Sequence, residues 1–148
     1  MKKHVAYIII GMACLMFSSC HLTSSNNGDL DGLWQLMTVE NLQTGAITDG
    51  RDVGGGIRWA FMGDLLSLRN DDKEVFCRFE HAGETLKVYK PYLSGRFTNA
   101  QDDFPITDAA ELNVFGVYRL EEYFKILQLD GDDMRLESTT VRLTFRKY

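Results

Sequence analysis

The sequence predicts an all-β protein, an eight-stranded antiparallel up-and-down barrel with one short helix. The first observation is that apolar and polar residues alternate over short segments separated by turn residues, which is the period of strands with one buried face. The second is that the last segment, 141–147, needs a partner, because an isolated hairpin is only marginally stable in water. Pairing it with the segment that begins at Gly32 closes the sheet and removes both exposed edges. A sandwich of two sheets is the alternative that the pattern leaves open.

Eight segments carry the strand pattern. They are residues 33–40, 57–62, 65–69, 75–80, 85–89, 124–129, 134–137 and 141–147. The clearest is 57–62, where Ile57, Trp59 and Phe61 alternate with Arg58. Gly63-Asp64 has the composition of a two-residue hairpin turn. These short connections predict that most successive strands are neighbours in the sheet.

Residues 90–105 interrupt the alternation and contain both prolines of the chain, so we expect a long irregular loop there. After this loop, Thr107 or Asp108 can cap a helix that has Glu111 in its first turn. We expect about two helical turns, ending near Gly116, because glycine commonly ends a helix. Loops 41–56 and 90–105 are then expected to border the mouth of the barrel.

The N-terminus has the features of an exported lipoprotein. A short basic start precedes an apolar run at 5–17, which is too short for a comfortable membrane-spanning helix. Residues 16–20 (MFSSC) resemble a bacterial lipobox, in which the cysteine is acylated and becomes the new N-terminus. We therefore expect a signal peptide at 1–19, lipidation at Cys20, a polar tether at 20–31 and the barrel domain at 32–148. His21 is not the aspartate that retains enteric lipoproteins in the inner membrane, which favours the outer membrane; a plain secretory leader is the alternative.

Charge and composition argue against several classes of function. The chain has 16 basic and 21 acidic residues, and removal of Lys2 and Lys3 with the acid-free leader leaves a net charge of −7. Such a chain repels phosphate backbones, so we expect no nucleic-acid binding. No group of histidines, cysteines, serines or carboxylates has the spacing of a catalytic or metal site, so we expect neither an enzyme nor a cofactor. Cys77 alternates with apolar neighbours and is expected to be a buried structural thiol rather than a reactive one.

Two motifs carry a family resemblance. Gly32-Leu33-Trp34 resembles the Gly-x-Trp of the lipocalin and calycin superfamily, and the tail at 134–147 resembles that of lipocalin-like lipoproteins from Bacteroides-type bacteria. The resemblance implies that Trp34 plugs the closed end of the barrel and that Arg146 covers it, with Arg142 as the second choice. The predicted helix departs from the family pattern, because it precedes the sixth strand instead of following the eighth.

The barrel interior is where we expect a ligand. Its predicted lining is aromatic and apolar, and four further aromatic residues are expected at the rim. The proposed interior contacts are Trp59, Phe61, Phe79, Val88, Phe124 and Phe145, and the rim candidates are Tyr89, Tyr92, Phe97 and Phe104. Eight strands enclose either a filled core or room for one small ligand. The sequence thus predicts a lipid-anchored envelope protein that binds a small apolar ligand, or alternatively a solid barrel that binds another envelope protein through its loops.

Overall fold

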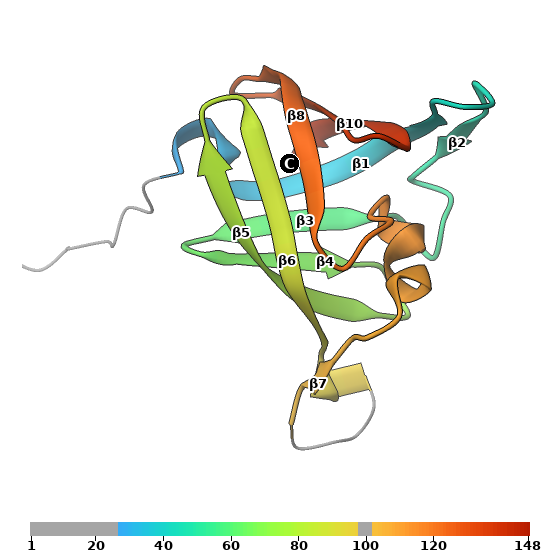
Figure 1. The fold of residues 1–148 in the computed structure, drawn as a ribbon, viewed down its shortest axis with the longest axis vertical. Coiled ribbons are helices and arrows are strands. Elements are labelled where there is room, and N and C mark those ends of the chain that lie inside the picture. Colours follow the sequence, from blue (N-terminus) through green and yellow to red (C-terminus); the bar gives the residue numbers. More distant parts are fainter. Residues whose placement is uncertain (1–26, 98–101) are drawn as a thin grey trace, which may run out of the picture.

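The structure is a computed structural model that describes residues 27–97, without the side chain of Phe97, and residues 102–148 (Figure 1). The predicted leader, Cys20 and most of the tether lie outside the described residues. The main strands are β1 (Gly32–Asn41), β3 (Arg58–Met62), β4 (Leu65–Arg69), β5 (Glu74–Ala82), β6 (Thr85–Leu93), β8 (Glu122–Leu129), β9 (Asp133–Glu137) and β10 (Val141–Lys147). Within the described residues, two short strands, β2 (Ile47–Asp49) and β7 (Phe104–Pro105), lie outside this series. The 3-10 helices of these residues are η2 (Gly28–Leu30), η3 (Gly95–Phe97) and η4 (Ala109–Phe115).

The sheet closes on itself, as the sequence predicted. The main strands follow the order β10, β9, β8, β6, β5, β4, β3, β1, and β10 returns to pair with β1 from Trp34 opposite Lys147 to Asn41 opposite Val141. Every pairing is antiparallel, so the chain forms an up-and-down barrel rather than a sandwich. Figure 1 shows β1 and β10 crossing the same side of the barrel.

The fifth predicted segment, 85–89, is longer than predicted. β6 continues past Tyr89 to Leu93. Lys90 lies within it at a bulge, where its backbone adopts a left-handed conformation (φ 50°). The register shifts there, so Arg78 of β5 faces Tyr89 whereas Phe76 faces Tyr92. The expectation of an irregular chain from residue 90 was therefore wrong for 90–93, since a bulge breaks the alternation without ending the strand.

The predicted helix is confirmed in position, although it is a 3-10 helix. Asp108 caps η4 by accepting a hydrogen bond from the Ala110 backbone N–H at 2.9 Å. Gly116 ends it with φ 85° and ψ 11°, the left-handed conformation that favours glycine. Figure 1 shows this helix at the end of the barrel away from the N-terminal chain. Its Leu112 and Phe115 side chains are buried in the core, so η4 closes that end.

Trp34 lies at the opposite end of the barrel. Its side chain is fully buried and its indole N–H donates to the Leu30 carbonyl of η2 at 2.9 Å. The cation over its ring is that of Lys147, with Nζ 4.9 Å from the ring centroid, and not that of Arg146. Phe145 points inward, so Lys147 shares its face whereas Arg146 points outward. The assignment of Arg146 was therefore wrong, and Arg142 is held on the outer face by Glu40 and Glu137.

The barrel interior is filled by its own side chains. Trp59 contacts Phe145 at a ring-centroid distance of 5.0 Å and Phe124 at 5.8 Å, while Phe61 contacts Phe79 at 5.0 Å. These contacts join β3 to β5, β8 and β10 through the centre of the barrel. The buried core of the described chain extends from Leu30 to Phe145, so the barrel has one core of its own, as expected of a domain that folds by itself.

Candidate functional site

The predicted interior contacts are core residues. Trp59, Phe61, Phe79, Val88, Phe124 and Phe145 are each 6% exposed or less. They pack against one another and leave no space at their ring contacts for a ligand of the predicted kind. The alternation of the strands correctly placed these residues inside. Of the two interiors that eight strands permit, the filled one is present. Tyr89 lies instead on the outer face, because it neighbours Val88 in a strand.

The outer face of the barrel is more distinctive. Strand register brings the outward side chains into rows that run across the strands. One row contains Leu33, Ala60, Ser67, Phe76 and Tyr92, which are successive register partners on β1, β3, β4, β5 and β6. The row has no charged residue. Such a row on the solvent side of an antiparallel sheet is unusual, because that side is commonly polar.

A second row lies beside the first and is charged. Gln35, Arg58, Arg69 and Glu74 are successive register partners on β1, β3, β4 and β5. Since neighbouring strands are about 4.8 Å apart, these side chains form one continuous edge. The outer wall therefore carries an apolar row and a cationic row side by side.

Between these rows lies an open hollow of about 360 Å³, which we call the wall groove. It is lined by Leu33, Arg58, Ala60, Met62, Ser67, Arg69, Glu74, Phe76 and Arg96. The small side chains of Ala60 and Ser67 lie in the middle of the apolar row, which is why the wall is hollowed there. Leu33 and Met62 are 39% and 59% exposed. The groove has a volume suited to a small molecule.

A second hollow of about 390 Å³, the bulge hollow, adjoins the wall groove along Phe76. Arg78, Lys90, Tyr92 and Asp103 are among its lining residues. The Lys90 bulge shifts the end of β6 relative to β5 and places Tyr92 opposite Phe76. The two hollows together form a track across the outside of the barrel.

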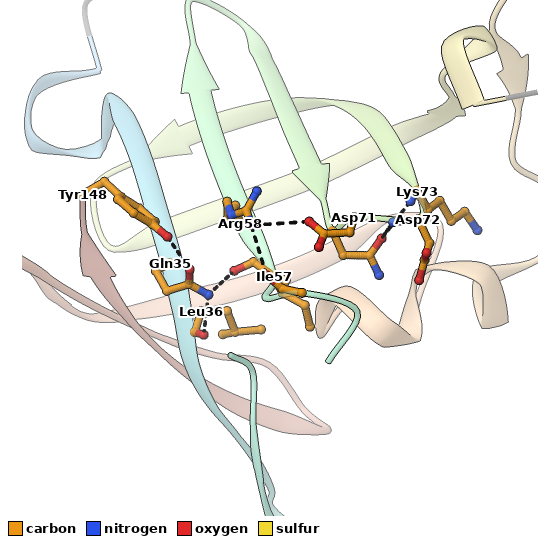
Figure 2. Close-up of polar contacts among 10 residues, drawn as sticks. Gln35, Leu36, Ile57, Arg58, Asp71, Asp72, Lys73 and Tyr148 are labelled. Atoms are coloured by element: carbon orange, nitrogen blue, oxygen red, sulfur yellow. Dashed lines mark hydrogen bonds and ion pairs between the residues drawn. The ribbon is translucent and has the colours of Figure 1, made fainter. Parts of the chain in front are cut away.

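Polar contacts hold the charged row in place (Figure 2). The Tyr148 hydroxyl donates to Gln35 Oε1 at 2.9 Å, and Gln35 Nε2 donates to the Ile57 carbonyl at 2.9 Å. Arg58 donates to the Gly55 carbonyl at 3.0 Å, and its guanidinium lies 3.6 Å from Asp71 Oδ1. Arg58 is thus a positioned and partly neutralised cation at the end of the groove.

Glu74 is the one carboxylate among the residues that line the wall groove. It is only 7% exposed, and one of its oxygens accepts a hydrogen bond from the Ser67 hydroxyl at 2.9 Å. Its carboxylate is therefore largely buried and is held by Ser67. A molecule in the groove meets the guanidinium groups of Arg69 and Arg96, whose side chains are exposed.

A separate polar cluster lies around Lys87. Its ammonium group is 4.7 Å from the ring centroid of Tyr89 and 3.4 Å from Glu121 Oε1. The Tyr123 hydroxyl donates to Glu121 at 2.6 Å, and this bond raises the pKa of Tyr123 and lowers that of Glu121. Lys87, Tyr89, Glu121 and Tyr123 thus contact one another on the outer face of the barrel.

Cys77 is a free cysteine buried in the barrel. Burial raises the pKa of the Cys77 thiol to about 12, which leaves it protonated and unreactive at neutral pH. Within 27–97 and 102–148, no group of three histidine, cysteine or acidic side chains could hold a metal ion. No helix in that part of the chain is long and apolar enough to cross a membrane.

Sequence reasoning missed the wall groove. Of the residues beside the wall groove, Tyr92 alone was among the ligand contacts that we predicted. Phe104, another predicted rim residue, is 49% exposed on β7 and lies outside the groove. The signal that could have found it is the apolar or small character of outward positions such as Ala60, Met62 and Phe76. These residues become neighbours only through strand register, which the sequence does not state.

Comparison with known proteins gives the following matches. A family model described as a lipocalin-like domain matches residues 15–148. A lipocalin-like protein from Bacteroides uniformis ATCC 8492 has a similar structure, with a TM-score of 0.55, 21% identity, and coverage of 82% of this chain and 100% of that one. An uncharacterized protein from Bacteroides eggerthii DSM 20697 has a TM-score of 0.53, 21% identity, and coverage of 80% and 99%. No curated protein matches the chain.

Proposed function

The chain belongs to the lipocalin-like domain family, and from this premise we propose that it is a non-enzymatic envelope protein that binds a small ligand on the outer wall of its barrel. The observation that carries the proposal is the contrast between a filled interior and a hollowed wall. Trp59, Phe124 and Phe145 occupy the space in which a barrel of this size would hold a ligand. The wall groove, by contrast, is open and has the volume of a small-molecule site.

The closed ends of the barrel also support binding on the wall. Trp34 and η2 cover one end, and η4 covers the other, with the Trp59 indole N–H donating to the Phe115 carbonyl at 3.2 Å. A ligand could enter only by displacing one of these elements. Removal of a large apolar side chain from a packed core costs about 2–5 kcal/mol, and displacement of Trp34 or η4 by a ligand is expected to cost free energy of the same order. The wall groove needs no such displacement.

Methionine methyl groups provide the test. In residues 27–148, Met62 lines the wall groove, whereas Met134 is fully buried in the core. We expect decanol or decanoate, added to methyl-labelled protein below their aggregation limits, to shift the NMR signal of Met62 and to leave that of Met134 unchanged. A shift of Met134 alone would place the ligand in the interior, and no shift of either signal by either probe would reject a small apolar ligand.

A matched pair of variants tests the same site. Phe76→Asp places a charge where the two hollows meet, so it is expected to abolish the Met62 response. Phe104→Asp changes an exposed phenylalanine outside the two hollows and is expected to leave the response intact. Equal effects of the two variants, at unchanged melting temperature, would contradict the wall groove as the binding site.

We also propose that the protein is anchored to the outer membrane by lipid on Cys20. The support is the lipobox-like MFSSC sequence at 16–20 and the polar segment that follows it. Metabolic labelling with an alkyne fatty acid is expected to mark the wild-type chain and not the Cys20→Ser variant. Label that persists in Cys20→Ser, or that is absent from both, would contradict lipidation at this residue.

A second candidate function is attachment to another envelope protein. The observation that favours it is the β1–β2 hairpin, which projects from the barrel in Figure 1 and carries Ile47 at 68% exposure. Among the described strands β2 pairs with β1 alone, so it offers a free strand edge. Cross-linking in cells tests this candidate, since a partner lost in an Ile47→Asp variant but kept in Phe76→Asp would favour it over the ligand-binding function.

A further inference from the structure

The wall groove joins apolar surface to cationic surface, and this combination restricts the chemistry of its ligand. The apolar row from Leu33 through Ala60 and Ser67 to Phe76 crosses four adjacent strands. Neighbouring strands lie about 4.8 Å apart, so a row across four strands is about 14 Å long, enough for a medium-length alkyl chain. Met62 flanks the row with 59% of its side chain exposed. An extended aliphatic group lying along the row would cover this apolar surface.

The cationic side of the groove has unused hydrogen-bonding capacity. In the described part of the chain, neither Arg69 nor Arg96 has an ion-pair or hydrogen-bond partner for its guanidinium group. Arg58 makes one hydrogen bond to a carbonyl and a longer contact to Asp71. A guanidinium group pairs well with a planar carboxylate, because it can donate two parallel hydrogen bonds.

The charges of the groove match a single negative charge. Three arginines line it, and two carboxylates, Glu74 in the wall and Asp71 beside Arg58, oppose them. One positive charge is left unmatched in a chain whose formal net charge is −5. The positive groove is therefore a local exception to the charge of the protein, and a monoanion would complete its neutralisation.

Resting on the proposed function, we propose that the wall groove binds a monoanionic amphiphile as a single molecule. Its head group lies between Arg69 and Arg96, and its alkyl chain lies across Ala60 towards Leu33 and Met62. The groove is a hollow of about 360 Å³ and not a flat surface, which fits one molecule better than a membrane. The expected class is a fatty carboxylate or a related ester with one negative charge.

The test compares probes of equal chain length that differ only in the head group. Decanoate, decanol and decyltrimethylammonium are titrated into residues 27–148 at concentrations below aggregation, with the Met62 methyl signal as the readout. Decanoate is expected to bind about tenfold more tightly than decanol, because a charge-assisted hydrogen bond contributes roughly one such factor. Decyltrimethylammonium is expected to bind more weakly than decanol, and the preference for decanoate is expected to shrink as salt is raised.

Arginine variants locate the head group. Arg69→Gln and Arg96→Gln are each expected to weaken decanoate binding about tenfold and to leave decanol binding unchanged. Arg119→Gln is the matched control, because Arg119 is exposed but lies outside the groove. All three side chains are exposed, so the melting temperature is expected to stay constant.

Three outcomes would overturn the inference. Equal affinity for decanol and decanoate, with Met62 still shifting, would reject the anionic head group while leaving the wall site in place. An effect of Arg119→Gln as large as that of Arg69→Gln would reject the assigned cations. Binding to phosphatidylglycerol vesicles without binding to monomeric decanoate would assign the groove to a membrane surface. A shift of Met134 in place of Met62 would instead reject the proposed function itself.

Discussion

Replacement of Trp34 by alanine is expected to lower the free energy of unfolding of residues 27–148 by about 3–5 kcal/mol. The side chain is fully buried, and its register partners are Trp59 on β3 and Lys147 on β10. Its loss leaves a cavity between the first and last strands of the barrel and removes the hydrogen bond to the Leu30 carbonyl that holds η2. Guanidinium chloride denaturation measures the change, and a loss below about 1 kcal/mol would contradict the role of Trp34 as the plug.

Three further variants separate the contributions to this loss. Trp34→Phe keeps most of the volume but leaves the Leu30 carbonyl without its donor, so we expect a loss of about 1–3 kcal/mol. Lys147→Gln removes the cation over the indole ring and is expected to cost about 0.5–2 kcal/mol. Arg146→Gln is the matched control and is expected to change stability by less than about 0.5 kcal/mol, because Arg146 is exposed.

The cation over Trp34 is Lys147 and not the predicted Arg146, which shows where the strand alternation and the family resemblance disagree. The family pattern pointed to an arginine on the last strand. The alternation of Val141, Leu143 and Phe145 places position 147 on the inner face and position 146 on the outer face. The local period of the strand was the better guide to the cation that covers Trp34. A side-chain assignment carried over from a family holds only where the strand phase agrees with it.

The sequence predicted the strands well because each strand is a local pattern. It also predicted η4, since the Asp108 cap and the Gly116 stop are both local signals. It did not predict the extension of β6, because Lys90 at a positive φ shifts the phase of a strand that continues. Nor could it decide between a filled and a hollow barrel, because that depends on the summed volume of side chains from many strands.

The wall groove was beyond sequence reasoning for a related reason. Ala60, Ser67 and Phe76 lie in three different strands, and none is unusual alone. Their meeting in one row depends on the register of two hairpins, and the approach of Arg96 depends on where η3 follows β6. A site built from residues facing the same way across several strands is a property of register. A site built on one loop is a property of local sequence.

Replacement of Gly116 by alanine is expected to lower the free energy of unfolding by about 2–5 kcal/mol through two separate effects. The residue has φ 85°, a conformation that costs an alanine about 1–2 kcal/mol. An added Cβ would also lie 2.7 Å from Leu143 Cδ2, inside the packed core. Overpacking of this kind typically costs about 1–3 kcal/mol. The change lies where η4 closes the barrel, so thermal or denaturant unfolding reports it directly.

Gly63→Ala separates the two effects. Gly63 has φ 61° in the turn between β3 and β4, and a Cβ added there would meet nothing within 4 Å. Its loss is therefore expected to be the backbone cost alone, about 1–2 kcal/mol. The excess loss in Gly116→Ala measures how firmly η4 is packed onto Leu143. Equal losses in the two variants would mean that η4 moves away from the core at little cost, and that the filled interior is not closed at this end.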